Sequence, residues 1–224
     1  MGKGAVVLLS GGQDSATVLA MVAAQSDQQI HTVSFDYGQR HRIELRCSIR
    51  LSQMAKAVHH HQIPINSFSF VTQSALLHDN KQNWPIDAPH PNNVNLPASF
   101  VPGRNLIFLT LAAALAYKFE IRDLYTGVCE TDYSGYPDCR LNTIDALQLA
   151  ISRGMDVPFT IHTPLMFDTK AETVLRMKDL GRLDWYKETH TCYEGVRPGC
   201  RVCPSCILRQ KGFDEAGIKD PLFE

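Results

Sequence analysis

The segment Ser10-Gly11-Gly12-Gln13-Asp14-Ser15 combines residue types that suit phosphate binding. It follows an apolar run at 5–9 and precedes a helical pattern at 16–24, so the sequence predicts a strand, a tight turn and a helix. Two glycines let the backbone approach a ligand closely, and a helix start offers free N–H groups and the positive end of its dipole. The hydroxyl groups of Ser10 and Ser15 add donors. We therefore expect an anion site that holds phosphate.

The order of these residues excludes two common phosphate loops. No Lys-Ser or Lys-Thr pair follows the glycines, as a Walker A loop requires, and the glycine spacing of a dinucleotide-binding turn is absent. The run Ser-Gly-Gly-x-Asp-Ser instead resembles the PP-loop of the ATP pyrophosphatase superfamily. The resemblance implies that the loop grips pyrophosphate and that ATP is split between its α and β phosphates to adenylate a substrate. The expected ATP site comprises Leu8, Leu9, Ser10, Gly11, Gly12, Gln13, Asp14, Ser15, Ala16, Thr17 and Val18.

The role of Asp14 stays open at this point, because a carboxylate beside phosphate is repelled unless its charge is offset. It either binds the Mg²⁺ that accompanies ATP or caps the helix that follows. Ser34 and Phe35, at the end of the next apolar run, are expected to lie near adenine or to be plain core of a strand.

Four of the seven cysteines crowd into the last part of the chain with the spacing C-x7-C-x2-C-x2-C. Four thiolates suit tetrahedral, structural zinc, but C-x2-C-x2-C also occurs at iron–sulfur clusters, so spacing alone leaves the metal open. Three nearby cations, Arg197, Arg201 and Arg209, are expected to offset the thiolate charge. The expected zinc ligands are Cys192, Cys200, Cys203 and Cys206.

Apolar runs that alternate with helical patterns indicate the scaffold of these sites. The alternation predicts an α/β fold with a doubly wound, parallel, five-stranded sheet of Rossmann-like type. In such sheets ligands bind at the carboxyl ends of strands, where the loop at 10–15 lies. The expected strands are 5–9, 30–35, 61–65, 123–128 and 159–162, and the expected helices are 16–24, 43–57, 105–119, 142–152 and 170–180, the last with a Thr169–Glu172 capping box.

These elements divide the chain into an ATP-binding α/β domain at 1–185 and a C-terminal zinc-binding segment at 186–224. Residues 78–103 interrupt the pattern, and five of the twelve prolines lie there. A long irregular loop inside a compact domain is typically a functional lid or a disordered segment, and we favour a lid over the active site. The run His59-His60-His61 could bind a metal, but an exposed helix-to-strand connection is the simpler interpretation.

Charge and hydropathy limit the partners. Twenty-two Lys and Arg residues against 23 Asp and Glu residues leave a formal net charge of −1 over 224 residues. Proteins that grip long stretches of RNA usually carry a basic excess, so we expect a small-molecule substrate and no nucleic acid. No apolar run is long enough to span a membrane, and the first residues run directly into the first expected strand without a signal peptide. We therefore expect a cytoplasmic protein with reduced cysteines and no membrane partner.

Five further segments narrow the resemblance to one family. They are FDYGQRH at 35–41, VPGRN at 101–105, TGVCETDYSGYPDCR at 126–140, HTPLM at 162–166 with KAET at 170–173, and TCY at 191–193. Together with the PP-loop and the cysteine spacing, they closely resemble the 7-cyano-7-deazaguanine synthase family of queuosine precursor biosynthesis. The resemblance covers nearly the whole chain and is weakest at 78–103 and after Gly212.

The resemblance implies a ligase that converts 7-carboxy-7-deazaguanine and ammonia into a nitrile. ATP activates the carboxylate, ammonia gives the amide, and further ATP activates the amide oxygen so that its loss leaves the nitrile. Activation is needed because such an oxygen is a poor leaving group until it is phosphorylated or adenylated. The sequence does not say whether ATP is split at the α or the γ phosphate in this reaction. The family also implies structural zinc, Mg²⁺ with ATP, and a homodimer.

The resemblance also suggests roles for single residues. Asp14, Arg104 and Lys170 are expected to be catalytic, with Arg104 and Lys170 contacting the substrate carboxylate or the ATP phosphates. A helix-surface role for Lys170 is the alternative. The deazaguanine base needs hydrogen-bond acceptors and donors, and tyrosine rings stack well on a purine-like ring. The expected substrate-binding residues are Glu130, Asp132, Tyr133, Tyr136, Asp138 and Arg140.

Two other functions remain open from the sequence. A tRNA-thiolating enzyme of the same superfamily, with an iron–sulfur cluster, would need a catalytic cysteine and a basic RNA surface. The balanced charge argues against it. A non-catalytic nucleotide-binding module would bind ATP without releasing pyrophosphate or phosphate, and the richness of polar loops around the sheet argues against that.

Overall fold

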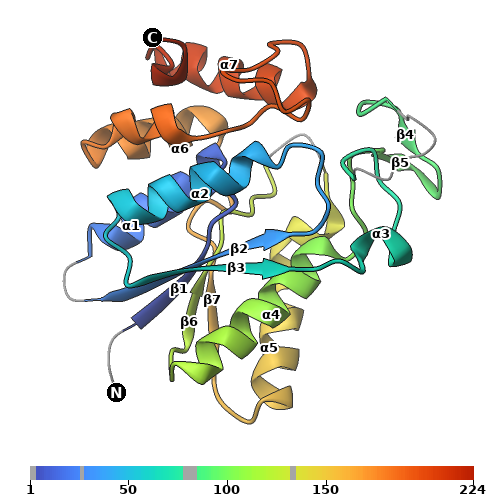
Figure 1. Ribbon diagram of the computed structural model, residues 1–224, viewed down its shortest axis with the longest axis vertical. Coiled ribbons are helices and arrows are strands. Elements are labelled where there is room, and N and C mark those ends of the chain that lie inside the picture. Colours follow the sequence, from blue (N-terminus) through green and yellow to red (C-terminus); the bar gives the residue numbers. More distant parts are fainter. Residues whose placement is uncertain (1–3, 26–27, 78–84, 132–134) are drawn as a thin grey trace.

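Five parallel strands form the central sheet of the computed structural model, which describes residues 4–25, 28–77, 85–131 and 135–224 (Figure 1). The strand order is β3-β2-β1-β6-β7, and every neighbouring pair is parallel. The expected five-stranded parallel sheet is therefore confirmed. The strands are β1 (Gly4–Leu8), β2 (Gln29–Asp36), β3 (His59–Pro64), β6 (Asp123–Tyr125) and β7 (Thr160–His162).

Helices cover both faces of this sheet, as a doubly wound fold requires. Side chains alternate along a strand, so β1 sends Ala5 and Val7 into the core on one face and Val6 into the core on the other. The first core is closed by α1 (Gln13–Ala23) and α2 (Ile43–Met54), and the second by α4 (Arg104–Lys118) and α5 (Leu141–Gly154). Burial on both faces explains why the strand sequences read as continuous apolar runs.

Two more helices form an outer layer beyond α1, as Figure 1 shows. They are α6 (Lys170–Asp179) and α7 (Pro204–Ala216). The expected capping box opens α6: the Thr169 hydroxyl accepts from the Glu172 N–H at 3.2 Å, and the Glu172 carboxylate accepts from the Thr169 N–H at 2.7 Å. Pro204 begins α7, and Gly217 ends it in the left-handed conformation, with φ of 65°.

The segment expected to be irregular contains a short antiparallel hairpin, β4 (Pro89–His90) with β5 (Asn93–Pro97). A backbone bond from the Ala75 N–H to the Ala98 carbonyl, 2.8 Å, ties it to the chain before it. Residues 78–84 lie outside the described part of the chain, and the lid role stays a prediction. The remaining short elements are α3 (Phe68–Val71) and the 3-10 turns Pro137–Cys139, Leu183–Glu188 and Pro221–Phe223.

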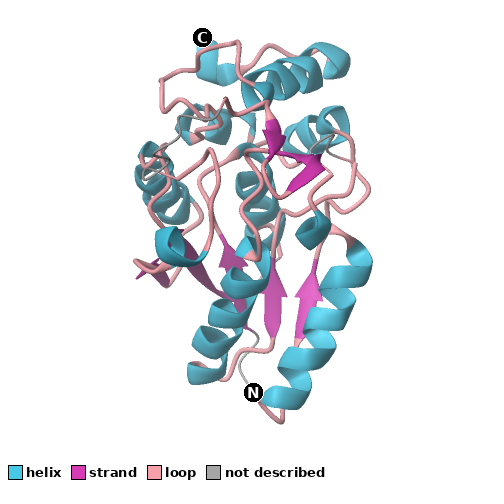
Figure 2. Cartoon of the chain, turned by 90° about the vertical axis from the view of Figure 1, so that its right-hand side faces the viewer, coloured by secondary structure: helices cyan, strands magenta, loops and turns pink. Residues whose placement is uncertain are grey.

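The five parallel strands of the central sheet end toward the half of the molecule that carries the hairpin and the C-terminus (Figure 2). The strand order reverses on either side of β1, because the chain leaves β1 for β2 and leaves β6 for β7 on the opposite side. Ligands bind at such a reversal, beyond the carboxyl ends of the strands. Of the helices described, none is both long enough and apolar enough to cross a membrane.

The three consecutive histidines are part of β3, which corrects the expectation of an exposed connection. His60 turns toward α2 and contacts the hydroxyl groups of Thr32 at 2.8 Å, Ser34 at 3.1 Å and Ser48 at 3.3 Å. Burial, and secondly the neighbouring His61, lowers the pKa of His60 to about 4. The hydroxyl groups on β2 and α2 explain how a histidine is accommodated at this strand position, which the sequence pattern did not predict to be part of a strand.

This environment predicts a pH-dependent stability. The unfolded chain takes up a proton on His60 near pH 6.5, whereas the folded chain resists it down to about pH 4. The stabilisation is complete above pH 6.5 and is lost progressively as the pH falls toward 4. His60→Gln should therefore show a shallower loss of unfolding free energy across this window, measured by urea titration at several pH values. Gln62→Ala, at an exposed position of the same strand with no titratable group, should keep the wild-type slope. Equal slopes in all three proteins would refute this account of His60.

Candidate active site

A cavity of about 800 Å³ lies at the carboxyl ends of β1, β2 and β6. Its walls come from the turn after β1, the end of β2, the loop after β6 and the start of α4. The segment 190–193 and the first turns of α7 close it from the side of the cysteine cluster. The size falls within the range of small-molecule sites in proteins. The position is the one that the sheet topology predicts for a ligand.

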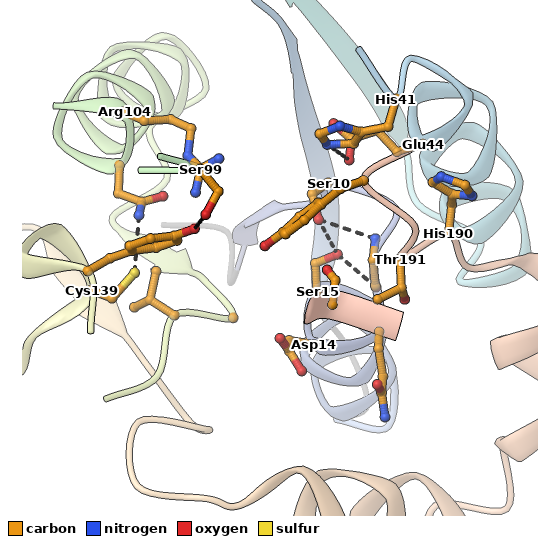
Figure 3. A pocket seen from close by; sticks show the side chains of 18 of the residues that line it. Ser10, Asp14, Ser15, His41, Glu44, Ser99, Arg104, Cys139, His190 and Thr191 are labelled. Carbon is orange, nitrogen blue, oxygen red and sulfur yellow. Dashed lines mark hydrogen bonds and ion pairs between the residues drawn. The ribbon is translucent and has the colours of Figure 1, made fainter. Parts of the chain in front are cut away.

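The loop at 10–15 forms one wall of this cavity (Figure 3). The Ser10 hydroxyl lies 3.1 Å from the Ser15 hydroxyl and accepts from the Gly12 N–H at 3.2 Å. The N-cap of α1 is Gly12, and no side chain caps the helix. The first-turn N–H groups of α1 and the two serine hydroxyls are therefore donors of the kind that suits an anion at a helix start.

Gly11 is held against the first turn of α2 too closely for any side chain. Its φ is +90°, and a Cβ there would lie 2.2 Å from the backbone oxygen of Glu44. Its own carbonyl accepts from the His190 N–H at 2.9 Å. The shape of the loop therefore depends on a glycine and on two segments distant in sequence.

The expected ATP residues separate into two groups. Those bordering the cavity are Leu8, Leu9, Ser10, Gly12, Gln13, Asp14 and Ser15. Those that do not border it are Gly11, which packs on α2, and Ala16, Thr17 and Val18, which are buried behind the loop. The Thr17 hydroxyl lies there 2.7 Å from that of Tyr186. Ser34 and Phe35 also border the cavity, and the Phe35 ring stacks on that of Phe108 with centroids 4.3 Å apart.

Asp14 and Lys170 form an ion pair at the edge of the loop at 10–15, called the phosphate loop below after its predicted ligand, with Lys170 Nζ 2.7 Å from Asp14 Oδ2. Lys170 is the first residue of α6, and its side chain is only 10% exposed. The N-cap residue of α1 is Gly12 and Asp14 lies in the first turn, so the Mg²⁺ and the helix-start interpretations of Asp14 both stay predictions. The ion pair also places Lys170 at the site rather than on a helix surface.

Arg104 lies on the wall opposite the phosphate loop (Figure 3). Its Nη1 is 3.4 Å from the Tyr37 hydroxyl, and its guanidinium lies over the Tyr136 ring at 5.9 Å. Burial by itself lowers the pKa of Arg104, but Tyr37, Tyr136 and Asp138 more than offset this, and the pKa is raised. Burial raises the pKa of Tyr37 to about 12, so the tyrosine stays neutral beside the cation.

The residues expected to bind the substrate are only partly brought together. Tyr136 borders the cavity, and its hydroxyl lies 2.8 Å from that of Ser99. Asp138 accepts from the first-turn Asn105 N–H of α4 at 3.0 Å, and Glu130 accepts from the Leu141 N–H of α5 at 2.6 Å. Arg140 is the N-cap residue of α5. Asp132 and Tyr133 lie outside the described residues.

The structure adds residues to which sequence reasoning gave no role. His41 and Glu44 pair at the cavity, with His41 Nε2 3.1 Å from Glu44 Oε2. Three more that border it are Asn105, Thr191 and Tyr193. The segments 35–41, 101–105 and 191–193, which carried the family resemblance, contain His41, Asn105, Thr191 and Tyr193. The sequence therefore marked these residues but did not indicate what they do. Glu44 had no such signal.

The four C-terminal cysteines converge on one point. Their sulfur atoms all lie within 4.8 Å of one another, and Cys200 Sγ and Cys206 Sγ are 3.9 Å apart. Tetrahedral zinc with four thiolates needs sulfur atoms about 3.8 Å apart, so the donor set fits such a metal. Burial raises the pKa of Cys200, but the N–H groups of Val202 and Cys203 outweigh it and lower the pKa to about 7.

The expected cations of this cluster have other partners. Arg197 donates to the backbone oxygens of Lys187 and Thr189, and Arg201 lies over the Phe223 ring at 4.6 Å. Arg209 pairs with Asp220 at 2.6 Å.

Comparison with known proteins decides the family. Residues 4–217 match the family described as Queuosine biosynthesis protein QueC. The chain is 50% identical over 219 residues to the 7-cyano-7-deazaguanine synthase of Laribacter hongkongensis, covering 98% of this chain and 93% of that protein. It is 48% identical over 221 residues to the synthase of Chromobacterium violaceum, with the same coverage.

The chain belongs to the QueC family. The resemblance noted from the sequence is thereby confirmed over nearly the full length. Among solved structures, the U34-tRNA thiolase NcsA from Methanococcus maripaludis gives a TM-score of 0.49 at 11% identity, covering 95% of this chain and 65% of that one. A likeness at that level has no bearing on the function of this QueC-family chain.

The packing of Gly11 predicts a large effect of one methyl group. Gly11→Ala should lower the free energy of unfolding by about 3 kcal/mol or more, because backbone strain adds to the overlap with the Glu44 carbonyl. Gly38→Ala is the matched control, since Gly38 has φ of +82° but nothing within 4 Å of its Cβ position. It should cost about 1 kcal/mol, the strain alone. Denaturant unfolding of both variants measures the difference, and equal losses would contradict the close contact.

The cysteine cluster predicts one metal ion per chain. Cys203→Ser should lose the metal, measured by elemental analysis, and lower the melting temperature by about 5–10 °C. Cys129→Ser, outside the cluster, should retain the full metal content. Full metal content in the Cys203→Ser protein would remove that residue from the ligand set.

Proposed function

We propose that this chain is an ATP-dependent carbon–nitrogen ligase that converts 7-carboxy-7-deazaguanine and ammonia into 7-cyano-7-deazaguanine, in queuosine biosynthesis. The observation that carries the proposal is that a helix start without a side-chain cap and an enclosed arginine face one cavity from opposite walls (Figure 3). The relatives named 7-cyano-7-deazaguanine synthase support it, the first at 50% identity.

ATP is proposed to lie along the phosphate loop with its adenine toward β2. The first-turn N–H groups of α1 and the hydroxyls of Ser10 and Ser15 suit its phosphates. Phe35 and Ser34 offer an apolar ring and a hydroxyl to the adenine. Asp14 offers a carboxylate oxygen, the donor type that Mg²⁺ prefers, and Lys170 beside it offers a cation to the departing pyrophosphate.

The deazaguanine carboxylate is proposed to meet Arg104. A guanidinium that keeps its charge in an enclosed site is well suited to a carboxylate, because hydrogen bonds between two charged groups are the stronger ones. Asn105 carries both a donor and an acceptor toward the base, and the Tyr136 ring offers a flat surface for it. Glu130 and Asp138 are assigned instead to the starts of α5 and α4, through the bonds that they accept.

The proposed reaction proceeds in two activations. A carboxylate oxygen attacks the α-phosphorus of ATP, and pyrophosphate leaves with the electrons of the broken P–O bond. Ammonia then attacks the carbonyl carbon, AMP leaves with the activated oxygen, and the nitrogen releases a proton to give the amide. In the second activation the amide oxygen attacks the α-phosphorus of another ATP, and pyrophosphate again leaves with the electrons of the broken P–O bond. The C–O bond then breaks as AMP departs with the oxygen, and loss of both N–H protons leaves the C≡N bond. The phosphate loop and Arg104 stabilise the charges that develop on the two leaving groups and the carbonyl oxygen.

Two metals and a partner copy complete the proposal. Zinc is assigned to the four-cysteine cluster as a structural ion, because four protein thiolates leave no open coordination position. Mg²⁺ bound with ATP supplies charge neutralisation at the phosphates. The family suggests a homodimer, which remains part of the proposal.

The rival interpretation is a thiolating enzyme with an iron–sulfur cluster. The family match favours the synthase, since it covers residues 4–217. A colourless protein with one zinc per chain would agree with the synthase, and a brown protein with iron and sulfide would agree with the rival.

The proposal predicts nitrile formation in a defined mixture. Protein, ATP, Mg²⁺, ammonium and 7-carboxy-7-deazaguanine should give 7-cyano-7-deazaguanine by mass spectrometry. Arg104→Lys keeps a cation but loses the planar two-point contact, so the KM for 7-carboxy-7-deazaguanine should rise about 10- to 100-fold while the KM for ATP changes little.

Arg122→Lys provides the matched control, because Arg122 lies over the rings of Tyr117 and Phe159 away from the cavity. Its kinetic constants should equal those of the wild type. A folded, zinc-loaded wild type that forms no nitrile would refute the proposed function, and an unchanged KM in Arg104→Lys would refute the role of Arg104 alone.

A further inference from the structure

Arg209 on α7 is a buried cation whose donors are all engaged inside the protein. It is 3% exposed, and its Nε and Nη2 donate to the two carboxylate oxygens of Asp220 at 2.6 and 2.8 Å. Nη1 donates to the hydroxyls of Thr189 at 2.7 Å and Thr191 at 3.0 Å, and Nη2 also donates to the Tyr186 carbonyl at 3.4 Å. A guanidinium has five N–H groups, and the five printed distances account for each of them.

These contacts give Arg209 a different role from the one its sequence position suggested. Its charge is paired with Asp220 rather than with the cysteine thiolates. It borders the cavity, yet every donor already has a protein acceptor, so no donor remains for a ligand. Any influence of Arg209 on the reaction must therefore pass through the residues that it holds.

One of those paths leads to the phosphate loop itself. His190 lies between the two threonines that Arg209 binds, and its N–H donates to the Gly11 carbonyl at 2.9 Å. The His190 carbonyl also packs on the loop, since a Cβ at Gly12 would lie 3.6 Å from it. The position of the 189–191 segment therefore fixes the backbone of both glycines.

A second path leads to the helix behind the loop. The hydroxyl of Tyr186, whose carbonyl Arg209 binds, lies 2.7 Å from the Thr17 hydroxyl on α1. Thr17 in turn donates to the Gln13 carbonyl in the first turn of that helix at 3.0 Å. Arg209 is thus connected to both ends of the anion site, the glycine turn and the helix start.

We propose that Arg209 is a positioning residue that holds the phosphate loop in its ATP-binding shape, and that it does so through the segment 186–191. The proposal rests on the proposed function, because it takes ATP as the ligand of the loop. A loop that is already ordered binds its ligand more tightly, since no ordering penalty is incurred on binding. The same contacts join the cysteine cluster to the loop, because Thr191 directly precedes Cys192 and Arg209 follows Cys206 by one helical turn.

Thr189 allows the cleanest test, because it is fully buried and does not border the cavity. Thr189→Val keeps the side-chain shape but removes the hydroxyl that accepts from Arg209 and donates to the Tyr186 carbonyl at 2.7 Å. The Kd for Mg·ATP, measured by calorimetry on the metal-loaded protein well below its melting temperature, should rise about tenfold. Thr189→Ser restores the hydroxyl and should bind Mg·ATP like the wild type. The KM for 7-carboxy-7-deazaguanine should stay within about twofold in both.

Arg209→Lys is the second variant, because lysine keeps the charge but supplies fewer donors without the planar geometry. It should weaken Mg·ATP binding by about tenfold or more. Arg201→Lys, in the same C-terminal segment but stacked on Phe223, should leave it unchanged. Lower melting temperatures with an unchanged Kd in Thr189→Val and Arg209→Lys would overturn the inference and leave the proposed function intact. A wild type that does not bind Mg·ATP would instead refute the proposed function, and the inference with it.

Discussion

The close approach of Gly11 to the first turn of α2 is the contact on which the cavity depends. No side chain fits between the Gly11 backbone and the Glu44 carbonyl, and the Gly11 carbonyl is held from another side by the His190 N–H. Three segments far apart in the chain therefore meet at one glycine: the turn after β1, the start of α2 and the approach to the cysteine cluster. The cavity opens beside that meeting point, so the fold and the site share the same constraint.

Two sets of groups that suit anions lie on opposite walls of this cavity (Figure 3). The phosphate loop offers backbone N–H groups and hydroxyls, with the Asp14–Lys170 pair at its edge. Arg104 faces it from α4 among tyrosine rings, where burial keeps Tyr37 neutral, while Tyr37, Tyr136 and Asp138 offset the effect of burial on Arg104 and keep the guanidinium charged. In the proposed complex, a nucleotide phosphate and a substrate carboxylate would thus lie together without sharing one cation. Such an arrangement suits a reaction in which one anion must attack the other.

Local patterns in the sequence were sufficient for the sheet, the turn at 10–15, the capping box and the cluster of four C-terminal cysteines, because each depends on residues close together in the chain. Local patterns were not sufficient to predict the partners of single charged groups. Glu130 and Asp138 follow a strand end, as substrate ligands do, yet their carboxylates reach the starts of α5 and α4. Arg209 was assigned to the thiolates by its place in the sequence, but Asp220 and the 186–191 segment take its donors. His60 fits β3 only because hydroxyls on β2 and α2 surround it. Such partners are determined by packing between segments that lie far apart in the chain, and a single sequence does not show which segments meet.

The most direct test of the account follows the oxygen that must leave. 7-Carboxy-7-deazaguanine labelled with ¹⁸O in its carboxylate would be turned over with ATP and ammonium, and the nucleotide products analysed by mass spectrometry. If the carboxylate attacks the α-phosphorus held at the phosphate loop, the label appears in AMP as the amide and nitrile form. Label found only in water, with unlabelled AMP and phosphate, would show that the oxygen never passes through phosphorus and would contradict the account.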